Sequence, residues 1–214
     1  MTEPKIKTGT TILGMIGTDG VLIASESRST VSTIIATEES DKLYEINNHI
    51  VMAGAGMGGD IQALSKMLQV EAKLFKTRNG RPISVEATVS MLGVVLHEYK
   101  FSPFYVGLII GGVDANGTPK LYAVDPAGDI APVSDHTAFA GSGWLSAEAI
   151  MDDSYKKMEV KELVPLAVRA INAAKKRDSA SGGDPNIALI TKDGIRRLKK
   201  DELAKLTESD KKRK

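Results

Sequence analysis

The chain reads TGTTILGMIGTDGVLIA over residues 8–24. This stretch holds two apolar runs, residues 11–16 and 21–24, separated by a turn at residues 18–20. An Asp-Gly pair between two apolar runs is a strong signal for a β-hairpin. The sequence therefore predicts that the first strands of the protein form an antiparallel pair, directly after a short polar leader.

Thr10 lies where this leader meets the first apolar run. A threonine hydroxyl is a weak nucleophile near neutral pH unless a base lies beside it. Cleavage after Gly9 would free the α-amino group of Thr10, whose ordinary pKa of about 7.7 to 8.0 leaves it partly neutral near pH 7. Thr10 would then supply nucleophile and base together. Gly-Thr-Thr is also an ordinary start of a strand, so the motif alone does not decide between the two interpretations.

The composition is that of an ordinary globular protein, with 214 residues, 42% hydrophobic and 26% charged residues, and a net charge of +1. This balance gives no overall reason to bind nucleic acid or an anionic membrane. The chain has no cysteine, which excludes disulfides, thiol nucleophiles and cysteine metal sites and is consistent with a reducing compartment. No apolar stretch approaches the roughly 18 residues that span a bilayer. We therefore expect a cytoplasmic protein without nucleic-acid or membrane partners.

The three histidines and the two ends of the chain say less about fold and function. His49, His97 and His136 are scattered without metal-ligand spacing or a neighbouring carboxylate pair, so we expect no metal site. Residues 1–9 are too short and polar for a secretory signal, and we interpret them as a tag or pro-segment. We expect residues 201–214 to form a charged C-terminal tail, in which the basic run at residues 211–214 is solvated and frayed.

Apolar periodicity predicts four helices, one from about residue 60 with apolar positions as far as Leu74, and others at about residues 84–99, 144–158 and 160–177. Further strands are expected at residues 34–36, 42–46, 50–56, 106–113, 120–124, 130–133, 137–140, 187–191 and 194–198. The predicted order is strands, two helices, strands, two helices and strands. Single strands and helices do not alternate along this chain, as they would in a parallel α/β protein. The order predicts an α+β fold in which helix pairs cover antiparallel sheets.

A glycine-rich turn, AGAGMGGD at residues 53–60, precedes the first predicted helix. Such turns often bind phosphate, but no Gly-Lys-Ser/Thr follows, and the carboxylate of Asp60 at the helix start would repel phosphate. We expect Asp60 to cap this helix. The turn is better suited to close approach of a peptide backbone, or to N–H groups that stabilise an oxyanion.

Seven short segments occur in an order and at a spacing that match one protein family. They are Gly9-Thr10-Thr11, Ala24-Ser25-Glu26-Ser27-Arg28, Lys42-Leu43-Tyr44-Glu45-Ile46, Ala53-Gly54-Ala55-Gly56 with Asp60, Gly111-Gly112-Val113-Asp114, Gly141-Ser142-Gly143, and Arg177-Asp178-Ser179-Ala180-Ser181-Gly182-Gly183. Over nearly its whole length the chain resembles a 20S proteasome β-subunit of the simple archaeal type. The resemblance implies the N-terminal-nucleophile hydrolase fold, a four-layer αββα sandwich of two antiparallel sheets flanked by helices, formed by one domain at residues 10–200.

The resemblance also implies a mechanism. Thr10 would be the nucleophile of a threonine endopeptidase, exposed when the zymogen removes residues 1–9 by autocatalytic cleavage between Gly9 and Thr10. Lys42 matches the family's active-site lysine, whose charged amine would favour the threonine alkoxide or relay its proton. Glu26 stands where the family commonly has aspartate, and it would supply the counter-charge that a buried lysine needs.

Further site residues are implied by the same resemblance. Ser142, Asp178 and Ser181 match the group that orients the new amino terminus, and the Gly56 backbone N–H matches the oxyanion donor. The pocket beside the nucleophile would be lined by uncharged residues, namely Ser29, Ser40, Tyr44, Gly54 and Gly58. Because Gly54 has no side chain, we expect an open pocket floor that accepts large apolar side chains, with a neighbouring subunit completing the wall.

The implied partners are those of a closed assembly. Seven β-subunits would form a ring, stacked against rings of α-subunits, and a regulatory AAA ATPase would feed unfolded proteins into the chamber, with no cofactor or metal at the site. The main alternative is an unprocessed or catalytically silent structural subunit of the β ring. An α-type ring subunit, which would lack Gly-Thr-Thr, and a non-proteolytic amidase of the same fold are further alternatives.

Overall fold

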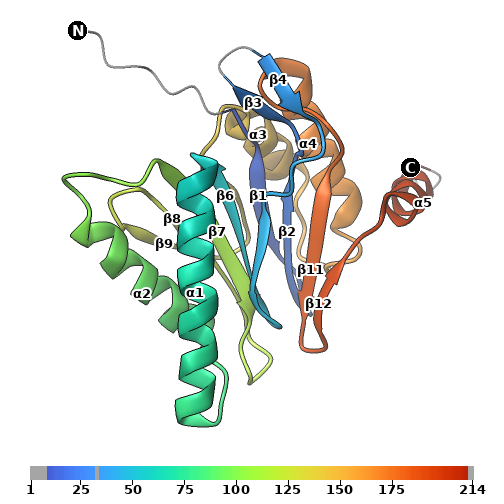
Figure 1. Cartoon of the computed structure of the whole chain (residues 1–214). Coiled ribbons are helices and arrows are strands. Elements are labelled where there is room, and N and C mark those ends of the chain that lie inside the picture. The colour runs from blue at the N-terminus through green and yellow to red at the C-terminus, as the bar shows by residue number, and fades with distance from the viewer. Residues whose placement is uncertain (1–8, 32–33, 212–214) are drawn as a thin grey trace, which may run out of the picture.

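The protein is described by a computed structural model that covers residues 9–31 and 34–211 and has four layers (Figure 1). One antiparallel sheet has the order β10 (His136–Ala138), β1 (Ile12–Ile16), β2 (Gly20–Ser25), β11 (Asn186–Thr191), β12 (Gly194–Arg197). The other has the order β5 (Leu43–Asn47), β6 (Ile50–Gly56), β7 (Val106–Val113), β8 (Pro119–Val124), β9 (Ile130–Val133). The flanking helices are α1 (Gly58–Asn79), α2 (Val85–Glu98), α3 (Trp144–Ser154) and α4 (Val164–Arg177).

Three apolar clusters hold these four layers together. One cluster, which includes Ile12, Ile23 and Ile109, lies between the two sheets. A second packs α1 and α2 on the β5–β9 sheet, and a third packs α3 and α4 on the other sheet. Every residue of β1, β2 and β7 is buried, as expected for strands with a layer on each face. The predicted α+β sandwich is confirmed.

The opening hairpin is confirmed and brings two distant parts of the chain together. β1 and β2 pair in the register Ile12 with Ser25 and Ile16 with Val21. The residue after β2 therefore lies beside the residue before β1, and the Glu26 backbone N–H donates to the Thr11 carbonyl at 3.1 Å. This register places Thr10 and Glu26 at the same end of the sheet.

Some boundaries differ from those predicted. After β2, the strands β3 (Ser29–Val31) and β4 (Ile34–Thr37) form a short ribbon. The sequence pattern did not predict β3, because two of its three residues are polar. Asp60 is not the cap of α1: the N-cap is Met57, and the Asp60 carboxylate accepts the Tyr105 backbone N–H at 2.9 Å. That carboxylate therefore joins the start of α1 to the start of β7.

The segment predicted to be a charged tail includes a helix that the sequence pattern did not predict, while residues 212–214 of the basic run lie outside the described residues. Helix α5 spans Lys200–Lys211, and Leu203, only 8% exposed, packs in the cluster beneath α3 and α4. The prediction was wrong because it weighed the charged residues and not the leucines between them, of which Leu206 also packs against this cluster. Within residues 9–31 and 34–211, no helix has the length and apolar character needed to cross a membrane.

Replacing Leu203 tests whether packing holds α5 in place. Because short helices are marginal without tertiary contacts, Leu203→Ala should speed amide hydrogen exchange in α5 by a factor of roughly 5 to 30. The exposed Lys205→Ala is the matched control on the same helix and should leave exchange unchanged. Equal protection in both variants would show that α5 does not depend on this contact.

Candidate active site

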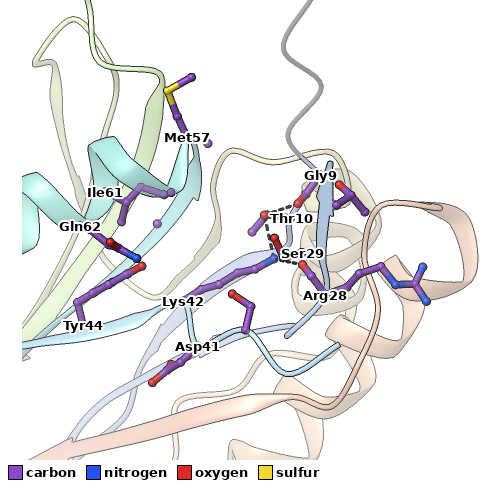
Figure 2. Close-up of a pocket in the computed structure, with 15 residues that line it drawn as sticks. Gly9, Thr10, Arg28, Ser29, Asp41, Lys42, Tyr44, Met57, Ile61 and Gln62 are labelled. Carbon is purple, nitrogen blue, oxygen red and sulfur yellow. Dashed lines mark hydrogen bonds between the residues drawn. The ribbon is translucent and has the colours of Figure 1, made fainter. Parts of the chain in front are cut away.

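The side chains of Thr10, Glu26 and Lys42 come from separate segments and meet at one end of the sheets. Figure 2 shows two of them, Thr10 and Lys42. The Lys42 Nζ donates to Thr10 Oγ1 at 3.0 Å and to the Arg28 carbonyl at 2.7 Å, and it is paired with the Glu26 carboxylate. An ammonium group has three N–H donors, and here each of them has an acceptor. The arrangement therefore suits a protonated Lys42 held against the Thr10 hydroxyl.

Glu26 is completely buried, and both of its carboxylate oxygens are used. One oxygen pairs with Lys42, and the other accepts the backbone N–H groups of Arg28 at 2.7 Å and Gly182 at 2.9 Å. Burial lowers the pKa of the Lys42 amine from its ordinary value, while the carboxylates of Glu26 and Asp178 oppose that shift. The pair thus has the counter-charge and hydrogen bonds that a buried ion pair requires.

The fold accounts for this meeting. Thr10 precedes β1, Glu26 follows β2, and Lys42 precedes β5. The Lys42 carbonyl accepts the Gly54 backbone N–H at 3.3 Å, which ties the start of β5 to β6 in the second sheet. The site therefore bridges the ends of both sheets, and it forms only where the two sheets are packed face to face.

A second cluster surrounds Asp178, at the end of α4. Its Oδ2 accepts the hydroxyls of Ser142 and Ser181, each at 2.6 Å. The Ser181 hydroxyl is also 2.8 Å from the Thr11 hydroxyl, and the Gly143 backbone N–H donates to the Thr10 carbonyl at 3.3 Å. The three residues named from the resemblance thus lie together, and Ser181 joins them to the Thr11 side chain.

A cavity of about 340 Å3 opens beside Thr10 and Lys42 (Figure 2). Its lining includes Gly56 and all five residues assigned to the pocket by resemblance, Ser29, Ser40, Tyr44, Gly54 and Gly58. The sequence reasoning missed other lining residues, namely Gly9, Arg28, Thr30, Asp41, Met57, Ile61 and Gln62. A signal for two of these was available, because Met57 and Ile61 are four residues apart, the spacing of one helix face.

The space at Gly54 is not open as expected. A Cβ on Gly54 would lie 2.5 Å from Cγ2 of Ile61, so the isoleucine occupies the space that the glycine leaves. Arg28 and Asp41 also line the cavity, which is therefore not purely uncharged. The apolar wall comes from the first turn of α1, whose packing over β6 is not visible in the sequence around Gly54.

Two glycines at the site have backbone positions that no other residue could take without movement. Gly56 has a φ of +133°, and a Cβ there would lie 2.0 Å from the Tyr105 carbonyl oxygen. A Cβ on Gly9 would lie 1.7 Å from the Cβ of Ala180. Both constraints concern backbone that borders Thr10: Gly9 precedes it, and Gly56 lines its cavity.

The expectation that every histidine is remote from carboxylate pairs was wrong for His136. Ligand atoms of His136, Glu148 and Asp152 lie within 4.8 Å of one another, with Nε2 of His136 at 3.2 Å from the Asp152 carboxylate. Burial raises the pKa of the Glu148 carboxyl. Helix α3 supplies both acids, so only the packing of α3 against β10 creates the cluster, which could offer three ligands to a cation.

Comparison with known proteins gives one consistent result. Residues 6–190 match the family described as "Proteasome subunit". The chain is 39% identical over 208 residues to "Proteasome subunit beta" of Methanosphaerula palustris, covering 97% of this chain and 98% of the relative. It is 40% identical over 200 residues to the protein of that name from Methanocorpusculum labreanum, covering 93% of each, and 37% identical over 207 residues to that of Archaeoglobus fulgidus, covering 96% of each.

Replacing Glu26 tests the buried ion pair. Removing one partner of such a pair costs about 3 to 5 kcal/mol, so Glu26→Ala should lower the free energy of unfolding by about that amount in denaturant titrations. Glu38→Ala is the matched control, because Glu38 pairs with Arg28 but its side chain is 53% exposed. Exposed pairs contribute about 1 kcal/mol or less. Equal losses in the two variants would contradict a structural role for the buried pair.

Proposed function

The chain belongs to the proteasome subunit family, as a β-type subunit of the 20S core, and from this premise we propose that it is a threonine endopeptidase with Thr10 as nucleophile. The observation that carries the proposal is the 3.0 Å contact between Lys42 Nζ and Thr10 Oγ1, with Glu26 buried behind the lysine. A surface lysine would not be paired and enclosed in this way. The contact gives a threonine hydroxyl a cationic neighbour, which favours its alkoxide.

In the proposed reaction, the free α-amino group of Thr10 accepts the hydroxyl proton while Oγ1 attacks the substrate carbonyl. The Lys42 ammonium stabilises the negative charge that develops on Oγ1, and the Gly56 N–H stabilises the oxyanion. The peptide C–N bond breaks, the amine product leaves with a proton, and an ester on Thr10 remains. Water then hydrolyses the ester. We propose that Ser142, Asp178 and Ser181 keep this amine in place, because Ser181 contacts the hydroxyl of the next residue, Thr11.

We propose that the same hydroxyl removes the leader. In the intact chain the Thr10 nitrogen is an amide, and the Thr10 hydroxyl is hydrogen-bonded to the Gly9 carbonyl oxygen. Attack of Oγ1 on the Gly9 carbonyl carbon would break the Gly9–Thr10 C–N bond, with the hydroxyl proton passing to the nitrogen, so that the leader moves to oxygen as an ester and the Thr10 amine becomes free. Hydrolysis of the ester would then release the leader and restore the hydroxyl. Gly9 is the one residue of the predicted pro-segment, residues 1–9, within the described part of the chain; residues 1–8 lie outside it.

The cavity beside Thr10 is proposed to bind the substrate side chain on the amino side of the cleaved bond. Tyr44, Met57 and Ile61 supply its apolar surface. Ile61 limits its depth at Gly54, so an apolar side chain would pack against the start of α1. Arg28 and Asp41 also line the cavity, but their charged groups are already paired, Arg28 with Glu38 and Asp41 with Arg197.

As a proteasome subunit the protein assembles with other subunits into the proteasome core. We propose a heptameric β ring stacked on rings of α-subunits, to which a AAA ATPase delivers unfolded proteins in the cytoplasm. An alternative is a structural ring subunit that keeps its leader. In such a subunit Thr10 would stay linked to Gly9 as an amide and would have no free amine to act as base.

Replacing the nucleophile separates these two functions. In the assembled particle Thr10→Ala should retain residues 1–9 by intact mass and lower peptide hydrolysis by a factor of about 10^4 or more. Thr77→Ala, on the exposed surface of α1, is the matched control and should be processed and active. Hydrolysis that persists in Thr10→Ala would refute the proposed nucleophile, and a wild-type chain that keeps its leader would support the structural alternative.

Substituting Gly9 tests the proposed self-cleavage. Gly9→Ala would place a Cβ against that of Ala180, which should displace the Gly9 carbonyl from Oγ1 and slow removal of the leader, measured by mass over time. The double variant Gly9→Ala, Ala180→Gly removes the clashing methyl group and should restore part of the rate. Rapid processing of the single variant would show that close packing at Gly9 is not needed.

A further inference from the structure

A second cavity, of about 450 Å3, adjoins the site. Its lining comes from the end of β6 at Ala55 and Gly56, residues 105–107 at the start of β7, Pro126, and residues 139–142 after β10. We call it the leaving-side groove. Gly56, the candidate oxyanion donor, lines both this groove and the first cavity, so the two meet at the point where a substrate carbonyl would lie.

The groove also touches the nucleophilic residue. Ala140 and Gly141 have φ angles of 59° and 82°, in the left-handed region, so the chain after β10 turns sharply there. A Cβ on Gly141 would lie 2.1 Å from the Thr10 carbonyl oxygen, which shows that the backbone of the groove wall packs directly on Thr10. The Gly143 N–H, just beyond the groove, holds the same carbonyl at 3.3 Å.

We propose that the leaving-side groove binds the substrate residues on the carboxyl side of the cleaved bond and selects apolar or aromatic side chains there. This inference rests on the proposed endopeptidase function. If the acyl side of the peptide occupies the first cavity with its carbonyl oxygen at Gly56, the chain must continue past Gly56 on the other side of Thr10. The groove is the cavity that begins there.

The chemistry of the groove sets its preference. None of its lining residues is charged, in contrast to the first cavity, which has Arg28, Asp41 and Lys42. Phe139 is partly buried, whereas Tyr105 is 58% exposed and offers a ring face for contact with an apolar side chain. A charged side chain would lose hydration in this groove and gain no opposite charge from its lining.

The backbone of Tyr105 is held rigidly while its ring is free to bind. Its N–H donates to the Asp60 carboxylate at 2.9 Å, and its carbonyl accepts the Met57 N–H at 2.7 Å. Replacing the side chain therefore alters the groove and leaves these backbone bonds in place. Tyr99 offers a matched control, because it is 52% exposed and does not line the groove.

The test uses assembled, processed wild-type protein and internally quenched peptides that are identical except for the first residue after the cleaved bond, which is phenylalanine, leucine, glycine or aspartate. Mass spectrometry confirms the cleaved bond. We expect kcat/KM to be at least roughly 10-fold higher for the phenylalanine and leucine peptides than for the aspartate peptide. A 10-fold ratio corresponds to a difference of about 1.4 kcal/mol in transition-state binding. Tyr105→Ala should reduce this ratio to roughly 3-fold or less, and Tyr99→Ala should keep the wild-type ratio.

Each outcome decides the proposal. A wild-type ratio near one, with all four peptides cleaved, would overturn the groove and leave the endopeptidase function standing. A ratio that Tyr105→Ala does not change would also overturn it, because selection would arise elsewhere. Failure to cleave any peptide, in protein shown by mass to begin at Thr10, would remove the proposed function and the groove with it.

Discussion

The buried ion pair between Lys42 and Glu26 is the interaction on which the site depends. Two charges lie where water is almost excluded, and such a pair is tolerated only when its remaining hydrogen-bonding groups are also satisfied. Here the Lys42 amine also reaches Thr10 and the Arg28 carbonyl, and Glu26 also holds the backbone N–H groups of Arg28 and Gly182. The pair therefore connects β1, β2 and β5 with the loop after α4.

Through the loop after α4, the Lys42–Glu26 pair is also connected to the Asp178 cluster. Gly182, whose N–H binds Glu26, lies beside Ser181, and Ser181 joins Asp178 and the Thr11 hydroxyl. The same carboxylate that neutralises Lys42 thus positions the segment that contacts the Thr11 side chain. Gly56 has a comparable double role, because it borders both cavities and its φ of +133° excludes a side chain. The buried charges of Lys42 and Glu26 and the backbone of Gly56 thus lie at the place where the proposed peptide substrate would bind.

Much of the fold could be predicted from periodicity and turn chemistry. Local patterns predicted the hairpin at Asp19-Gly20, strands β6, β7 and β9, and helix α2. Helix α5 was missed because its leucines are sparse, and their burial depends on a cluster formed by α3, α4 and the sheet. The approach of Glu148 and Asp152 to His136 was missed for the same reason, since it arises from packing between elements and not from spacing.

By itself, the sequence determined the α+β class, the order of the elements, the family resemblance and the set of residues that includes Thr10, Glu26 and Lys42. These follow from local patterns and short motifs, which each segment carries without its neighbours. Only the tertiary structure decided that Ile61 fills the space at Gly54 and that Asp60 binds the Tyr105 N–H instead of capping α1. It also decided that a second cavity begins at Gly56. Contacts between segments far apart in the chain depend on how helices and sheets pack, and no local pattern encodes that geometry.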